Sequence, residues 1–242
     1  MALINLRNAL MAGKRKPSAK DYVQNGLVAM WDGIENVGWG QHSNSETSTW
    51  VDLVGGHDMS IMGTVPAQVF NDISFVNSNQ PFGTLNRDKI LENATEYTIE
   101  TCGALTAADS DAVLLQIRAA NKTGWNVFKY GSGVYVGPAN EFSFSFTTGI
   151  MHVVGVVTQS SAAYYRNGSL AQTKSGDYSA NIAQMQTIDV NKFSSSGWGY
   201  ADVMTGSNWS GNIYFARVYS RTLTASEIAA NYAIDKERFG LT

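Results

Sequence analysis

The chain has 242 residues, of which 15% are charged, and it contains 23 Ser, 18 Thr and 19 Asn. A single cysteine, Cys102, excludes an internal disulfide. No apolar run approaches the roughly 18 residues of a membrane span, and the net charge of −3 is atypical of a nucleic-acid surface. We therefore expect neither a nucleic-acid partner nor a membrane. The length fits one large all-β domain.

Charge divides the chain near residue 21. Residues 1–21 carry five basic side chains and one acid, a net +4, whereas residues 22–242 carry 12 basic and 19 acidic side chains, a net −7. The start is unlike a secretory signal, because the triplet Lys14-Arg15-Lys16 follows the apolar residues instead of preceding them. The split predicts a basic N-terminal arm, 1–21, joined to a domain, 22–242.

Apolar residues of the arm recur at roughly helical spacing, which predicts a short amphipathic helix ended by Gly13 and Pro17. Such a helix is marginal alone and needs a surface to pack on. A frayed terminus is the alternative interpretation. The residues expected to anchor the arm are Leu3, Ile4, Leu6, Leu10, Lys14, Arg15 and Lys16.

From residue 26 the pattern becomes that of short strands separated by turn residues. Alternation within 141–146 places Phe142, Phe144 and Phe146 on one buried face, and Asn167-Gly168 predicts a hairpin. Residues 32–49 are expected to form a long loop. The predicted strands are 26–31, 50–53, 59–62, 96–102, 112–119, 125–130, 133–136, 141–146, 151–158, 162–166, 169–173, 187–193 and 212–219.

One helix is predicted near the C-terminus, where Thr224-Ala-Ser-Glu227 forms a capping box. Its apolar residues Ile228, Tyr232 and Phe239 can then dock on the sheets. Many short strands and one terminal helix predict an all-β fold, a two-sheet antiparallel jelly-roll sandwich with a short C-terminal helix and an N-terminal arm.

Several stretches together resemble the concanavalin A-like, laminin-G-like jelly-roll superfamily over about residues 25–240. They are 26–32 with 50–56, 152–157 with 164–168, and 211–219 running into 221–228. The resemblance implies the fold, which hosts lectins, glucanases, sialidase side domains and adhesion modules. The basic arm followed by Gly26-Leu-Val-Ala-Met-Trp-Asp-Gly33 is also similar to proteins of gut bacteria and their phages, in which such a domain belongs to a virion or surface component.

Catalytic and metal chemistry have little support in the sequence. Glucanases of the superfamily carry Glu-x-Asp-x-Glu on one strand, and no such string occurs here. We therefore expect no catalytic residue. Asp109 and Asp111 are interpreted as solvated turn residues, with a Ca²⁺ site as the alternative because hard cations take clustered oxygens. No other metal or cofactor is expected.

Ligand-binding candidates are aromatic and polar residues in turn-rich segments. Trp31 and Trp50 match core positions, His152 and Cys102 are interpreted as structural, and His42 lies in the long loop. A tryptophan between glycines is often exposed and can stack on a sugar or a protein partner. The alternative is that each loop tryptophan folds back over the sandwich. The candidates are Trp39, His42, Trp198, Tyr200, Asn208 and Trp209.

The leading hypothesis is a non-enzymatic structural and adhesion protein, a phage virion component that displays a lectin-like domain. Its arm would bind other virion or surface proteins, the domain would bind glycans, and the chain would form a homo-oligomer as virion components commonly do. It would be assembled in the bacterial cytoplasm. The alternatives are a free carbohydrate-binding module on a bacterial cell surface and a glycoside-cleaving enzyme with carboxylates from distant strands.

Overall fold

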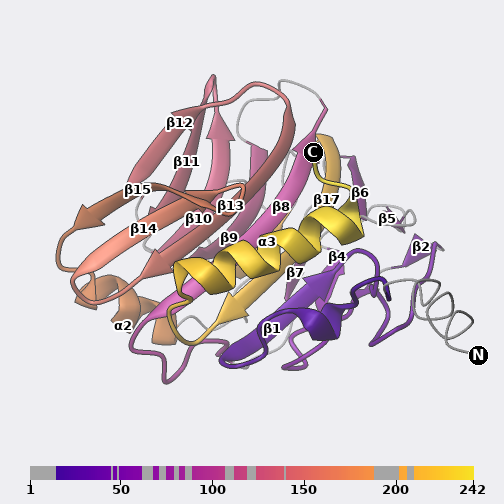
Figure 1. The fold of residues 1–242 in the computed structure, drawn as a ribbon, viewed down its shortest axis with the longest axis horizontal. Coiled ribbons are helices and arrows are strands. Elements are labelled where there is room, and N and C mark those ends of the chain that lie inside the picture. The colour runs from indigo at the N-terminus through magenta and orange to yellow at the C-terminus, as the bar shows by residue number, and fades with distance from the viewer. Residues whose placement is uncertain are drawn as a thin grey trace, which may run out of the picture.

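The computed structural model of the chain shows two antiparallel β-sheets packed face to face, with one long helix lying across the outer face of one sheet (Figure 1). This architecture confirms the predicted two-sheet jelly-roll sandwich. The description applies to residues 15–44, 46–47, 49–61, 68–70, 75–78, 82–84, 89–106, 112–118, 124–138, 140–187, 202–205 and 210–242.

The first sheet has nine strands, and every pairing in it is antiparallel. Its neighbours are mostly not consecutive in sequence, as the crossovers of a jelly roll require. In spatial order the strands are β15 (Ser169–Ser175), β14 (Ser161–Arg166), β13 (Gly149–Val157), β8 (Tyr97–Leu105), β17 (Ser210–Tyr219), β6 (Phe75–Ser78), β5 (Gln68–Phe70) and β2 (Glu46–Thr47), with β1 (Leu27–Asp32) also paired to β17.

The second sheet has eight strands, again all antiparallel. In spatial order they are β12 (Phe142–Ser145), β11 (Gly133–Pro138), β10 (Gly124–Tyr130), β9 (Ala112–Arg118), β16 (Asp202–Thr205), β7 (Phe82–Thr84), β4 (Met59–Ile61) and β3 (Thr49–Trp50). The helical segments are the 3₁₀ turn η1 (Ala19–Asp21), α2 (Ser179–Thr187) and α3 (Ala225–Phe239). No described helix is long and apolar enough to span a membrane.

The core between the sheets is built around three fully buried tryptophans, Trp31, Trp50 and Trp125. The indole N–H of Trp31 donates to the carbonyl of His57 at 3.0 Å, and that of Trp50 donates to the carbonyl of Asp32 at 3.1 Å. The predicted core positions of Trp31 and Trp50 are confirmed. Trp125 begins the predicted strand 125–130 and is an inward-facing residue of β10.

The strongest local signals in the sequence are also confirmed. Asn167 and Gly168 adopt positive φ values of 51° and 73° between β14 and β15, as a tight hairpin requires. Thr224 accepts a hydrogen bond from the Glu227 backbone N–H, and α3 ends at Gly240 in the left-handed conformation. Phe142 and Phe146 are buried and Phe144 packs against the core, so the predicted apolar face of this segment is confirmed.

Several elements differ from the prediction. Strands β2, β5, β6, β7 and β16 were not predicted, because two to four residues place at most two side chains on each face and show no alternation. Helix α2 was also missed, so the C-terminal helix is not the only described one. Thr187, predicted to begin a strand, ends α2, and the rest of that predicted strand, 188–193, lies outside the described residues.

Candidate functional site

The first described residues, 15–22, lie against the domain. Asp21 caps the short turn η1 by accepting from the Ser18 backbone N–H at 2.6 Å, and it pairs with the Arg15 guanidinium at 2.5 Å. These hydrogen bonds lower the pKa of Asp21 to about 2. Arg15 and Lys16 of the predicted arm are exposed. The other predicted anchoring residues, Leu3, Ile4, Leu6, Leu10 and Lys14, lie outside the described residues.

A buried ion cluster joins α3 to the nine-stranded sheet. Arg217 of β17 makes a bidentate pair with Asp235 of α3, at 2.9 and 2.7 Å, and a third contact with Glu100 of β8 at 2.7 Å. All three side chains are fully buried. His152 Nε2 also lies 3.2 Å from an Asp235 oxygen. The cluster fixes the helix on the sheet with charge-assisted hydrogen bonds.

The environment shifts the two carboxyl groups in opposite directions. Burial raises the pKa of Asp235, but the Arg217 charge and the hydrogen bonds from His152 and Arg217 outweigh it, so the pKa falls below its usual range. Burial also raises the pKa of Glu100, and there the Arg217 charge does not compensate. Glu100 Oε1 has no hydrogen-bond partner, which agrees with its poorer solvation.

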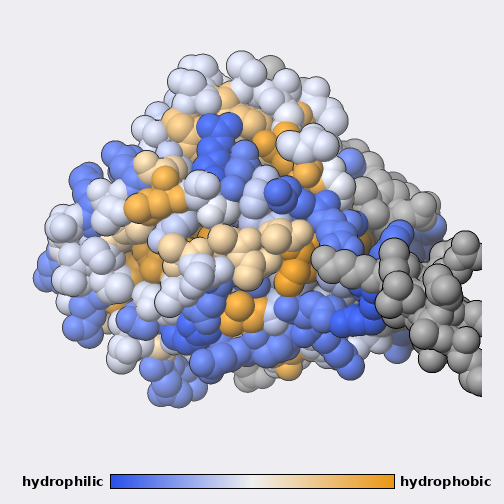
Figure 2. All heavy atoms as spheres, in the orientation of Figure 1, coloured by the Kyte–Doolittle hydropathy of each residue, from blue (hydrophilic) through white to orange (hydrophobic). Residues whose placement is uncertain are grey.

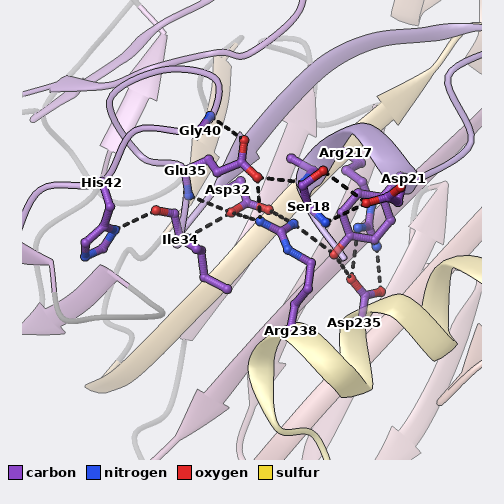
Figure 3. A network of polar contacts seen from close by, with 12 residues as sticks. Ser18, Asp21, Asp32, Ile34, Glu35, Gly40, His42, Arg217, Asp235 and Arg238 are labelled. Atoms are coloured by element: carbon purple, nitrogen blue, oxygen red, sulfur yellow. Dashed lines mark hydrogen bonds and ion pairs between the residues drawn. The ribbon is translucent and has the colours of Figure 1, made fainter. Parts of the chain in front are cut away.

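A second group of ion pairs continues this cluster toward the N-terminal segment (Figure 3). The Arg238 guanidinium contacts Asp32 at 2.6 and 3.0 Å and Glu35 at 3.2 Å. Glu35 also accepts from the backbone N–H groups of Ala19 and Gly40, at 2.7 Å each. The carboxylates in this region are therefore occupied by guanidinium or backbone donors, and they hold together α3, the loop after β1 and residues 15–22.

The predicted binding residue His42 lies at a hollow of about 410 Å³ beside this second group of ion pairs. Its Nδ1 lies 2.6 Å from the Ile34 carbonyl oxygen, and its Nε2 contacts Asn44 Oδ1. Because Glu35 and Arg238 at the hollow already bond to the protein, they stabilise the fold. The hollow is lined by Lys16, Pro17, Ser18, Ile34, Glu35, Gly40, Gln41, His42, Glu237 and Arg238.

The other predicted candidates are placed less favourably or not described. Trp39 is half-buried against the cluster that contains Tyr22 and Tyr219, and the Lys20 ammonium lies 5.5 Å from its ring centroid. Trp39 and His42 lie in the same loop, but only His42 lines the hollow. Trp198, Tyr200, Asn208 and Trp209, and the Ca²⁺ candidates Asp109 and Asp111, lie outside the described residues.

The outer face of the eight-stranded sheet carries a different kind of surface, which was not predicted. Phe128 of β10 and Tyr135 of β11 are cross-strand neighbours, and their rings stack with centroids 5.2 Å apart and an interplanar angle of 19°. Their strand neighbours Val127, Val134 and Val136 belong to the core, so Phe128 and Tyr135 face outward.

We name this surface the aromatic face. Tyr130, two residues after Phe128 on the same side of β10, is 57% exposed. Ser143 and Ser145 of β12 are paired with Tyr135 and Gly133 and are exposed, opposite the buried Phe142. The aromatic face consists of Asn126, Phe128, Tyr130, Tyr135, Ser143 and Ser145.

Asn126 is the unusual member of the aromatic face. It is 3% exposed and lies two residues before Phe128 on the outward side of β10, cross-strand from Gln116 and Gly137. Its Oδ1 has no hydrogen-bond partner. An unsatisfied buried amide oxygen costs about 1–3 kcal/mol, so its presence calls for an explanation. In the sequence, the alternation of aromatic residues with valines in 125–136 is the pattern that could have predicted the aromatic face.

Other polar groups have structural partners. The carboxylate of Asp52 accepts hydrogen bonds from the backbone N–H groups of Met30 and Val54 and lies 3.0 Å from His57 Nδ1, which fixes the turn after β3. Within the described ranges, no group of three acidic, histidine or cysteine side chains could hold a metal ion. Figure 2 shows the face that carries α3, where both hydrophilic and hydrophobic residues lie around the helix.

Fold and surface together define a two-sheet antiparallel β-sandwich of the jelly-roll type with an aromatic outer face. No protein-family model and no curated protein matches the chain. Solved structures do match: the binding domain of botulinum neurotoxin DC in complex with rat synaptotagmin II has a TM-score of 0.56 and 13% identity, covering 86% of this chain and 51% of that chain.

Two further structures give the same likeness. Sialidase of Trypanosoma rangeli in complex with sialic acid has a TM-score of 0.56 at 13% identity, over 93% of this chain and 34% of that chain. A structure of botulinum neurotoxin type C, whose cell entry depends on interaction with two ganglioside molecules, has a TM-score of 0.56 at 13% identity. The match covers 86% of this chain and 51% of that chain. The chain thus spans about half or a third of these proteins, and at this identity the likeness shows the fold alone.

Proposed function

We propose that this protein is a non-enzymatic adhesion domain that binds carbohydrate on the aromatic face. The observation that carries the proposal is the outward-facing Phe128–Tyr135 stack with the exposed Tyr130 beside it. Aromatic side chains offer a flat apolar surface on which the C–H face of a sugar ring can stack, and Tyr adds a polar hydroxyl. The toxin and sialidase structures of similar fold, which bind gangliosides and sialic acid, support carbohydrate binding in general and not a particular sugar.

Polar groups next to the rings suit a sugar as well. The exposed Ser143 and Ser145 contribute hydroxyls that can both donate and accept hydrogen bonds. The amide of Asn126, which is 3% exposed, lies two residues from Phe128 along β10. Ligand sites typically combine an apolar surface with a few placed polar groups. The aromatic face has this composition.

A glycosidase activity is less well supported. Retaining glycosidases need two carboxyl groups about 5–5.5 Å apart, one of them able to donate a proton. Asp32 and Glu35 bond to Arg238, and Asp235 bonds to Arg217, so these carboxylates serve the ion pairs of the fold. This arrangement favours binding without catalysis.

We also propose that the N-terminal arm joins the domain to a larger assembly, such as a phage particle, with a bacterial cell surface as the alternative location. The support is that residues 15–22 are fixed to the domain: Ala19 donates to Glu35, and the Tyr22 hydroxyl donates to Asp235 at 2.7 Å. A pull on the arm would therefore be transmitted to α3 and the sheet. Homo-oligomer formation stays a prediction.

The glycan proposal is tested by screening the protein on a glycan array and comparing two variants. Tyr130→Ala should abolish binding, whereas Leu170→Ala should leave it unchanged. Tyr130 and Leu170 are matched, because they are 57% and 56% exposed and lie on different sheets. Absence of binding to any glycan, or equal binding by the two variants, would contradict the proposal.

A further inference from the structure

The side chains that make up the aromatic face are all neutral. Three of them lie on β10, one lies on β11, and the two serines lie on β12. We infer, on the basis of the proposed function, that the face selects neutral glycans, with hydroxyl or acetamido groups as the recognised polar groups, and disfavours sialylated or otherwise anionic ones. This choice of ligand class follows from the charges around the face and from the orphaned acceptor on Asn126.

Anion recognition in proteins depends on cations. Arg and Lys bind carboxylates through short charge-assisted hydrogen bonds, and a face without them gives an anion no compensation for lost water. Lys129 of β10 lies on the opposite side from Phe128 and Tyr130, is 2% exposed, and donates to the Gly131 carbonyl at 2.6 Å. It is therefore directed away from the aromatic face.

A further charged pair lies near these strands. At the β12 side of the sandwich, Lys174 forms an ion pair with Glu141. The two charges neutralise each other, so this pair gives the aromatic face no net positive charge.

Asn126 determines whether the ligand should donate or accept a hydrogen bond at this position. Its orphaned atom is Oδ1, an acceptor, so the missing partner is a donor. A sugar hydroxyl or an acetamido N–H can donate, directly or through one bridging water. A carboxylate has only acceptor oxygens and would be repelled by the amide oxygen.

The spacing also suits a sugar on the ring stack. Residues two apart on a strand are separated by about 7 Å, so Asn126 lies about one sugar ring away from Phe128 along β10. A pyranose stacked on Phe128 and Tyr135 could therefore direct a hydroxyl toward Asn126. Ser143, next to Tyr135 on β12, can bond a hydroxyl on the other side.

The experiment uses matched oligosaccharides that differ only in a terminal sialic acid, with the full chain as the binding protein. We expect the sialylated member to bind at least about tenfold more weakly than the neutral one. Because no ion pair contributes, the affinity for the neutral member should change less than about twofold between roughly 0.05 and 0.5 M NaCl.

The variant that tests Asn126 is Asn126→Leu, which removes the acceptor at nearly constant size. It should weaken the neutral oligosaccharide about tenfold or more while the protein stays folded by circular dichroism. Preference for the sialylated member, with binding still sensitive to Tyr130→Ala, would overturn this inference and leave the proposed function standing. Binding of neither member by the wild-type protein would overturn both.

Discussion

The outer faces of the two sheets differ in their charge and in how their polar atoms are hydrogen-bonded. Beneath α3 the nine-stranded sheet buries Arg217, Glu100 and Asp235, and nearly all their polar atoms bond to one another. The eight-stranded sheet carries stacked rings, a 57% exposed tyrosine and an orphaned amide oxygen. Charged side chains thus fix a helix on one sheet, whereas the side chains of the aromatic face are neutral, as the proposed glycan site requires.

The largest expected effect is on the α3 side. Arg217→Ala should lower the free energy of unfolding by about 3–5 kcal/mol, because it leaves Glu100 and Asp235 buried without a counter-charge. Urea denaturation measures this. Arg221→Ala is the control: its ion pair with Glu227 is partly exposed, so the loss should stay within about 1 kcal/mol. Equal losses for the two variants would contradict a structural role for the buried cluster.

On the aromatic face we expect a substitution that raises the free energy of unfolding instead of lowering it. Asn126→Leu removes a buried amide oxygen that has no partner, so the free energy of unfolding should rise by about 1–3 kcal/mol. The matched control is Asn181→Leu, because Asn181 accepts from the Tyr97 hydroxyl and donates to the Gly124 carbonyl. That variant should be less stable than the wild type. A loss of stability in Asn126→Leu similar to that control would show that Asn126 serves the fold.

The smallest effect concerns the exposed end of α3. Hydrogen bonds from Arg221 and the Thr224 backbone lower the pKa of Glu227 from 4.5 to about 2. A depressed pKa gives stability that is complete above pH 4.5 and is lost as the pH falls toward 2. Glu227→Gln should therefore flatten the fall in unfolding free energy in this window, by no more than about 1 kcal/mol because the pair is partly exposed. Superimposable pH profiles would contradict this.

Local signals explain what the sequence could predict. The capping box at Thr224, the Asn167-Gly168 turn and the alternation around Phe142 depend on residues a few positions apart, so they can be recognised without the fold. The fold class followed from many such signals. Trp125 shows the limit: the sequence predicted its strand, but only the pairing of the strands shows that the indole lies in the core.

The candidate site depends on longer-range pairing. Arg217 and Glu100 are 117 positions apart, so their ion pair cannot be read from spacing along the chain. The Phe128–Tyr135 stack requires both the β10–β11 register and the knowledge of which side of each strand faces the core. Of the six predicted ligand-binding residues, only Trp39 and His42 are described, and they lie in the loop near residues 15–22.

The most direct test of the division between the two faces is a nuclear magnetic resonance titration of the isotope-labelled protein with a bound neutral oligosaccharide. We expect the largest shifts in the backbone amide signals of Phe128, Tyr130 and Tyr135, with unchanged signals along α3. Shifts concentrated on α3 or around His42, with none on β10 and β11, would contradict the central claim that the aromatic face is the binding surface.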